Sequence, residues 1–161
     1  MIDDEVKLIT LVLIGAIVVV AISPIIASSK IVEPLSELGI LGPNGKLGDY
    51  PNEVKVGERV NLFIYVGNQE GRSMYYQVLA KLGDELSTLS DIKTLDATPF
   101  AVLKTVLMNG QNTILPITLS FDSVGLNKRL VFELYKYNPD SKSFEYDNKL
   151  VQLWLNITST S

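Results

Sequence analysis

Apolar and polar residues alternate along much of the chain after residue 50, which is the pattern of half-buried β-strands. In residues 60–66 (VNLFIYV) an aliphatic side chain occupies every second position, so these side chains are expected to share one face of a strand. Glycine, asparagine, proline and aspartate separate the alternating segments, as turns do. The pattern predicts about seven strands, at residues 54–56, 60–66, 74–82, 101–108, 113–121, 129–137 and 150–157.

Short strands at this spacing, without a long amphipathic helix among them, predict an all-β immunoglobulin-like antiparallel sandwich of about 100 residues. Pro116 lacks the N–H that a central strand must donate, so its segment is expected at a sheet edge or a bulge. Residues 87–95 fit either a crossing strand or a loop. Because the sequence has no cysteine for a disulfide, packed side chains from two inner faces must form the core.

The start of the chain has a different pattern. Residues 8–27 (LITLVLIGAIVVVAISPIIA) carry no charge, and as a helix they would be about 30 Å long, the thickness of a bilayer's hydrocarbon core. This run predicts a single N-terminal transmembrane α-helix. Its acidic beginning (MIDDEVK) and its length favour a retained anchor over a cleaved signal peptide. A pilin-like helix packed in a filament core is a further alternative.

The chain is therefore expected to have four parts: a transmembrane anchor at 1–29, a stalk at 30–49, the sandwich at 50–158 and a tail at 159–161. Lysines flank the apolar run on both sides, so the positive-inside rule does not decide the orientation. Asn156 begins the sequon NIT and is a candidate glycosylation site, which favours a sandwich outside the membrane. We expect a single-pass protein of the cell membrane with its C-terminal domain outside.

Composition narrows the chemistry. The sequence contains neither histidine nor cysteine, which excludes Cys/His metal sites, a cysteine nucleophile and a histidine-based triad. Fourteen basic against 18 acidic residues give a net charge of −4. That balance argues against a nucleic-acid partner, because such proteins neutralise phosphates with lysine and arginine.

Two acidic segments are candidates for a metal site or a catalytic site. Residues 138–147 hold oxygen ligands suited to Ca²⁺ but lack the spacing and the glycine of an EF-hand loop, so a polar hairpin is the simpler interpretation. Four loop acids are candidates for glycoside hydrolysis, although nothing in the sequence brings two of them together: Asp84, Glu85, Asp91 and Asp96. We predict no catalytic residue, no metal ligand and no cofactor, and hence no enzyme.

Partner binding is the remaining role for the exposed positions. The segment NQEGR at 68–72 is expected at a hairpin tip, where sandwiches carry recognition residues, and tyrosine and tryptophan combine an apolar body with a polar atom. The candidate partner-binding residues are Asn68, Glu70, Arg72, Tyr135, Tyr137 and Trp154.

Three stretches resemble a known family. They are LGPNGKLGDYPNEVKVGERVNLFIYVGNQEGRSMYYQV (41–78), NKRLVFELYK (127–136) and LWLNIT (153–158). They are similar to the extracytoplasmic part of an archaeal membrane-protein family catalogued as domain of unknown function 1616. The resemblance implies topology and fold without chemistry, since the family has no settled activity. Members often carry several helices before this domain, whereas this chain has one, so roles tied to the extra helices do not carry over.

These observations predict a membrane-anchored extracytoplasmic sandwich that acts as a non-enzymatic binding or assembly module, such as an accessory subunit of a cell-envelope complex. Its expected partners are the lipid bilayer and other cell-envelope proteins or glycans. A pilin-like filament subunit is the alternative, and an enzyme acting on envelope polymers through carboxylates is a third.

Overall fold

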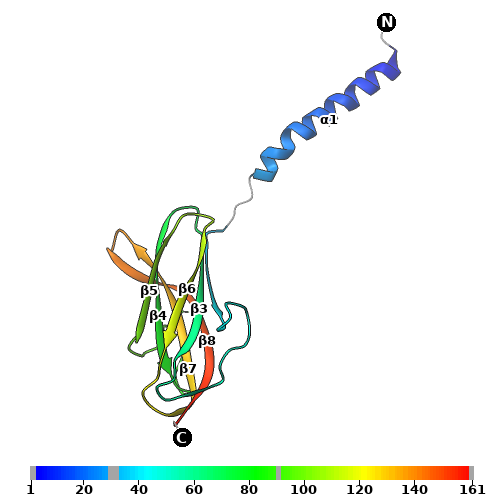
Figure 1. Cartoon of the computed structure of the whole chain (residues 1–161). Coiled ribbons are helices and arrows are strands. Elements are labelled where there is room, and N and C mark those ends of the chain that lie inside the picture. Colours follow the sequence, from blue (N-terminus) through cyan, green and yellow to red (C-terminus); the bar gives the residue numbers. More distant parts are fainter. Residues whose placement is uncertain (1–2, 29–32, 90–91, 160–161) are drawn as a thin grey trace. The chain divides into compact units, whose positions relative to one another are not determined.

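The structure is a computed structural model that describes residues 3–28, 33–89 and 92–159, in two compact units, Met1–Glu33 and Pro34–Ser161 (Figure 1). The first unit consists of one helix, α1 (Asp4–Ser28). Its described side chains from residue 8 to residue 21 are all apolar, glycine or threonine, and all are exposed within this unit.

The predicted location in the membrane needs correction. Within the described part of the chain, no helix combines the length and the apolar character that crossing a bilayer requires. The prediction of a single-pass protein of the cell membrane with its C-terminal domain outside is therefore wrong.

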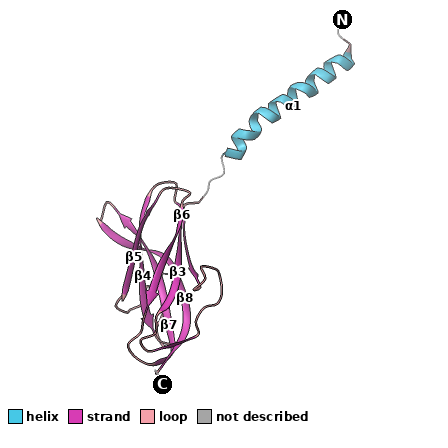
Figure 2. Cartoon of the chain, viewed as in Figure 1, coloured by secondary structure: helices cyan, strands magenta, loops and turns pink. Residues whose placement is uncertain are grey.

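The second unit is a two-layer β-sandwich (Figure 2). Sheet A has the order β1-β3-β6, and sheet B has the order β2-β8-β7-β4-β5. All neighbouring strands are antiparallel except β2 and β8, which are parallel. The strands are β1 (Leu35–Leu41), β2 (Glu53–Lys55), β3 (Val60–Gln69), β4 (Met74–Gly83), β5 (Ala101–Leu107), β6 (Asn112–Leu119), β7 (Gly125–Asn138) and β8 (Ser143–Thr158).

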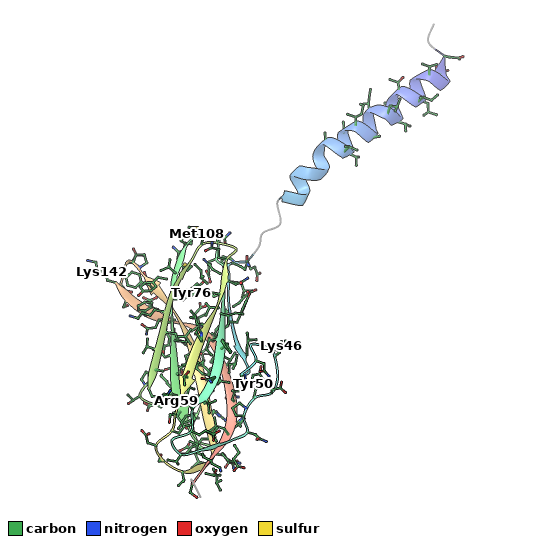
Figure 3. The ribbon with its side chains drawn as sticks, viewed as in Figure 1. Lys46, Tyr50, Arg59, Tyr76, Met108 and Lys142 are labelled. Atoms are coloured by element: carbon green, nitrogen blue, oxygen red, sulfur yellow. The ribbon has the colours of Figure 1, made fainter. Side chains whose placement is uncertain are left out.

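The core lies between the two sheets and follows the alternation of the sequence. The even-numbered aliphatic residues of β3 that were expected on one face are buried in it, and β4 and β7 supply the facing side chains. Tyr76 of β4 is fully buried there and lies between the sheets in Figure 3. Apolar packing without any disulfide therefore holds the layers together, as expected for a chain without cysteine.

Two segments differ from the expected elements. Leu35–Leu41, predicted within a stalk, forms β1, where it pairs with β3 and buries Ile40 in the core. β8 begins at Ser143 rather than near residue 150, and its pairing with β7 shifts between Leu134 and Tyr135. Such a bulge inserts unpaired residues and interrupts the period of two on which the prediction depended. The position of Pro116 is confirmed, because β6 is an edge strand of sheet A.

A long connection covers part of the outer face of sheet B. We call residues 84–100 the strap; residues 90 and 91 lie outside the described part of the chain. Val131 and Glu133 of β7 alternate with the core residues Leu130 and Phe132, yet both are fully buried. Leu95 of the strap is buried as well, so the strap packs on the outer face of the sheet at this place.

Candidate functional site

The outer face of sheet B carries aromatic side chains at two separate places, and Tyr75 and Trp154 are their exposed members. Tyr137 pairs with Phe144 at the hairpin end of β7, and Arg129 pairs with Trp154 near its beginning. Eight residues of strand separate the two pairs, a distance of about 26 Å. The strap crosses the sheet between them, at Glu133.

We call the first place the aromatic patch: Tyr75, Val106, Tyr137 and Phe144, with Lys104. Tyr75 is opposite Val106 on β5, so these residues form a row across four strands. The ring of Tyr75 lies 4.9 Å from that of Phe144 and 6.0 Å from that of Tyr137. Val106 is 65% exposed and Tyr75 is 37% exposed. These rings therefore form one contiguous aromatic surface rather than scattered side chains.

A pocket of about 230 Å³ opens at this patch. Its lining is largely apolar, with Met74, Val106, Pro139 and the two tyrosines, and Arg72 is its charged member. The ammonium group of Lys104 lies 5.1 Å from the centre of the Phe144 ring, a cation–π distance. The patch is thus an apolar surface with basic side chains at its border.

Two predicted binding residues, Glu70 and Arg72, lie near the same end of the sandwich but in different settings. Arg72 is exposed and lines the pocket of the aromatic patch. Glu70 belongs to what we call the Lys136 cluster: Ser36, Glu70, Tyr76, Lys136 and Asp147. Lys136 donates to Glu70 at 3.0 Å and pairs with Asp147 at 2.5 Å, while the Ser36 hydroxyl donates to Glu70 at 2.6 Å. The cluster therefore connects the two sheets: Ser36 lies in β1 and Glu70 directly follows β3, whereas Lys136 and Asp147 lie in sheet B.

Opposing effects set the charges of this cluster. Burial acts to raise the pKa of Glu70, but hydrogen bonds from Ser36 and Lys136 outweigh it and hold that pKa below its ordinary 4.5. Burial likewise acts to lower the pKa of Lys136, but Asp147 and Glu70 raise it above 10.5. Both groups are therefore charged near neutral pH, as a partly buried ion pair requires.

Asn68 is fully buried and stabilises the turns at this end. Its amide nitrogen donates to the carbonyls of Arg72 and Leu107, each at 2.8 Å, and its side-chain oxygen accepts the N–H of Glu70 at 3.0 Å. An asparagine that satisfies backbone groups in this way is positioned by the fold. In the described structure its side chain points to these groups rather than to solvent.

Tyr135 contacts the strap anchor, which we define as Lys81, Leu95 and Glu133. Its hydroxyl donates to Glu133 at 2.9 Å, and its ring lies 5.5 Å from that of Tyr146. Burial and the Glu133 carboxylate raise the pKa of the Tyr135 hydroxyl, so it stays protonated and can donate. Glu133 also pairs with Lys81 at 2.9 Å, with almost no exposure of either side chain.

The anchor holds the strap by its backbone. Glu133 accepts the N–H of Leu95 at 2.5 Å, and Lys81 donates to the carbonyl of the same residue at 2.8 Å. The Lys81–Glu133 ion pair thus satisfies both the N–H and the carbonyl of Leu95, a residue that belongs to no strand.

Trp154 lies at the second place, which we call the Trp154 hollow: about 400 Å³ lined by Glu85, Asn127, Arg129 and Trp154. The guanidinium carbon of Arg129 lies 4.4 Å from the centre of an indole that is 43% exposed. Asn156, the candidate glycosylation site, supports this hollow, because its side-chain oxygen accepts the N–H of Asn127 at 2.9 Å.

The loop acids have different surroundings. Asp84 accepts hydrogen bonds from the hydroxyl of Ser87 and the N–H of Leu86, and the bond from Ser87 is the main reason that its pKa is lowered. Glu85 faces the Trp154 hollow, Asp96 is exposed on the strap, and Asp91 lies outside the described residues. Across the described residues, no group of three or more acidic side chains is placed to hold a metal ion, the 138–147 hairpin included.

The sequence alone did not predict most residues of the aromatic patch or of the Trp154 hollow. Tyr75 and Phe144 are not among the predicted binding residues, and nothing in the sequence connects Glu85, Asn127 and Arg129 with Trp154. The signal for the hollow is the pairing of Arg129 with Trp154, which depends on the register of β7 and β8. Because the bulge shifts this register, counting back from the hairpin turn places the wrong residue opposite Trp154.

Comparison with solved structures gives the fold. The CARDB domain of a Pyrococcus furiosus protein, crystallised in complex with di-metal ions, is 12% identical with a TM-score of 0.50. The match covers 79% of this chain and 96% of that domain. The shared fold is an immunoglobulin-like β-sandwich, as the sequence predicted.

Other solved structures match only in part. A β-glucosidase from Listeria innocua is 13% identical with a TM-score of 0.47, over 78% of this chain but 16% of the glucosidase. The sporulation control protein Spo0M from Bacillus subtilis is 7% identical with a TM-score of 0.44, over 78% of this chain and 50% of that protein. These partial matches give no support for an enzymatic activity.

Comparison of sequences gives the family. No curated protein matches the chain. Residues 30–156, which include every strand except the last residues of β8, match a domain family. The chain therefore belongs to the family described as domain of unknown function DUF1616.

Proposed function

We propose that the sandwich is a non-enzymatic recognition module that binds a partner protein through the aromatic patch. The observation that carries this proposal is the set of three mutually contacting rings from β4, β7 and β8, partly exposed beside an apolar pocket. Aromatic side chains, arginine and methionine are enriched in the buried centres of protein interfaces. They bury a large area at a small cost in conformational entropy, because the neighbouring rings already hold them in place.

The charges at the patch indicate the kind of partner. Arg72 and Lys104 border it, although the protein as a whole has a net charge of −4. A local basic border in an acidic protein attracts an acidic surface and repels a basic one. The partner is therefore a protein that presents an apolar side chain flanked by acidic residues, with the apolar side chain entering the pocket of about 230 Å³.

A site-specific photo-crosslinker tests this proposal. It is placed at Val106, which is 65% exposed in the patch, and for comparison at Leu126, which is 72% exposed at the beginning of β7. We expect a heterologous adduct from position 106 but not from position 126. Binding of the identified partner, in purified form, is then measured against Tyr75→Ala and Lys104→Glu. A loss of about 2 kcal/mol, roughly thirtyfold in affinity, is typical of a central aromatic side chain.

Two results would contradict the proposal. One is equal crosslinking of the same protein from both positions, which would mean contact without a preferred face. The other is an adduct of the chain with itself, together with a dimer in light scattering, because the patch would then join two copies. The roles of accessory subunit and of filament subunit stay predictions, since no contact described above bears on either.

A further inference from the structure

We propose that the Trp154 hollow binds a neutral pyranose unit of a glycan. The proposal is independent of the protein partner above, because the hollow lies at the other end of β7 from the aromatic patch. It starts from the exposed indole. Trp154 points away from the core, stays 43% exposed and lines the hollow of about 400 Å³. A large aromatic ring left open on a sheet face is an apolar surface that a ligand can cover.

Neighbouring groups hold the polar members of the hollow in position. Asn127 has a φ of 49°, a left-handed conformation that asparagine tolerates, and its N–H is bound to the side chain of Asn156. Its side-chain nitrogen donates to Glu85 at 3.3 Å. Arg129 is fixed by its stacking on Trp154 and by a bond from Nη1 to the carbonyl of Ser87 at 3.2 Å. The fold therefore already holds these groups in place, and a ligand does not have to order them when it binds.

The set of groups matches the chemistry of a sugar. A pyranose has one face of C–H groups, which packs on the negative face of an aromatic ring, and a rim of hydroxyls that both donate and accept. Glu85 supplies acceptor oxygens only, and Arg129 supplies donors only. Asn127 supplies both, as an amide does.

The charges favour a neutral ring. Glu85 repels a carboxylate, a sulfate or a phosphate at close range, and Arg129 repels an ammonium group. One negative and one positive side chain in the same hollow leave no net charge for an ion to neutralise. The hydroxyls of a neutral sugar use both side chains without burying an unpaired charge.

The sequence offers a specific probe of this place, because Trp154 is the chain's single tryptophan. Its fluorescence, and the NMR signal of its indole N–H, report on the hollow alone. The full chain is titrated with the methyl pyranosides of glucose, mannose and galactose, and with the hexasaccharides of the first two. We expect a saturable change for at least one of these probes, with Kd of about 1–10 mM for a single ring and tighter binding of its hexasaccharide.

Two substitutions assign the change to the hollow. Glu85→Gln keeps the shape and removes the charge, and Asn127→Gly keeps the left-handed backbone and removes the amide. Each should weaken binding about tenfold, as expected for the loss of a hydrogen bond to a charged or fixed group. Tyr137→Ser, in the aromatic patch, should leave the sugar titration unchanged. The proposal is overturned if no probe gives a saturable change at about 50 mM, or if both hollow variants bind like the parent chain.

Discussion

The strap anchor and the Lys136 cluster each join a lysine of sheet B to carboxylates, but they differ in what surrounds them. Lys81 and Glu133 are 8% and 0% exposed beneath the strap. Both bind the backbone of Leu95, and Glu133 also accepts the hydroxyl of Tyr135. Lys136 is 28% exposed at the end of the sandwich. Of its two carboxylates, Asp147 lies in β8 of sheet B and Glu70 directly follows β3 of sheet A. The first group attaches a loop to a sheet, whereas the second joins the two sheets.

This difference in burial decides what each group contributes to stability. Removing one partner of a buried pair leaves an uncompensated charge away from water, which is far more costly than the pair is favourable. Glu70 and Asp147 are themselves only 10% and 8% exposed, but they lie beside a lysine position that is 28% exposed, so water admitted there limits the cost of losing Lys136. The comparison therefore predicts a large effect at the strap anchor and smaller ones at the Lys136 cluster.

Lys81→Met is expected to have the largest effect. It should lower the free energy of unfolding by about 3–5 kcal/mol, because Glu133 is left buried without its cation. Urea denaturation followed by circular dichroism measures the loss. The double variant Lys81→Met, Glu133→Leu should recover part of it, since two apolar side chains leave no charge behind, although the peptide groups of Leu95 still lose their partners. A single variant that costs less than about 1 kcal/mol would mean that water reaches Glu133 through the strap.

Lys136→Met should cost about 1–2 kcal/mol, because it leaves Glu70 and Asp147 without their shared cation at a place that is partly open to solvent. The same denaturation measurement applies. Lys136→Arg is the matched control and should retain most of the stability, since its charge can still pair with both carboxylates. An effect equal to that of Lys81→Met would remove the distinction between the two groups.

Ser36→Ala should cost about 1 kcal/mol, the contribution of one hydrogen bond to a carboxylate. Ser36 is buried and its hydroxyl lies 3.1 Å from that of Tyr76 as well as 2.6 Å from Glu70. The loss should be accompanied by a rise in the pKa of Glu70, which NMR titration of its side-chain carbon detects. If that pKa stays where it is, Lys136 alone accounts for its depression.

The pH dependence of stability is expected to be the smallest effect. The pKa of folded Glu70 is below 4.5, so its contribution is present above that pH and is lost as the pH falls through the folded value. The pKa of folded Lys136 is above 10.5, so its contribution is present below that pH and is lost as the pH rises through the folded value. Denaturation series below pH 4.5 and above pH 10.5 check both directions. In Lys136→Met the alkaline loss should become smaller, and the part that remains comes from groups such as Tyr135, whose pKa is also raised in the folded protein.

Much of the sandwich could be predicted from the sequence, because most strands keep one face in the core. The strand predicted at 60–66 lies within β3, where alternate residues are buried. β1 was assigned to a stalk, with an extended piece at 38–41, because Pro34 and several nearby glycines resemble a linker, although Gly39 lies inside the strand opposite Tyr65. The beginning of β8 was missed because its polar residues around the bulge break the alternation.

The sites were harder to predict than the strands, for a physical reason. Glu133 and Lys81 occupy outer-face positions where charged residues are ordinary, so their burial depends on a strap that has no periodicity. Tyr137 and Trp154 were predicted as binding residues because they are aromatic, and both line pockets. The residues that complete these pockets come from other strands, so the sequence does not show which they are. The hydrogen bond between the Leu95 N–H and Glu133 joins residues 38 positions apart in the sequence. Such a contact forms only in the folded chain, so no local sequence pattern predicts it.

The way in which the strap is held has a consequence for its tolerance of mutation. Lys81 and Glu133 recognise peptide groups, which every residue possesses, so the attachment does not depend on the side chains exposed along the strap. Exposed positions such as Lys93 and Asp96 can change without loosening it, whereas a proline at position 95 would remove the N–H that Glu133 accepts. The outer strap residues are therefore a surface on which new specificities can evolve while the underlying sheet stays the same.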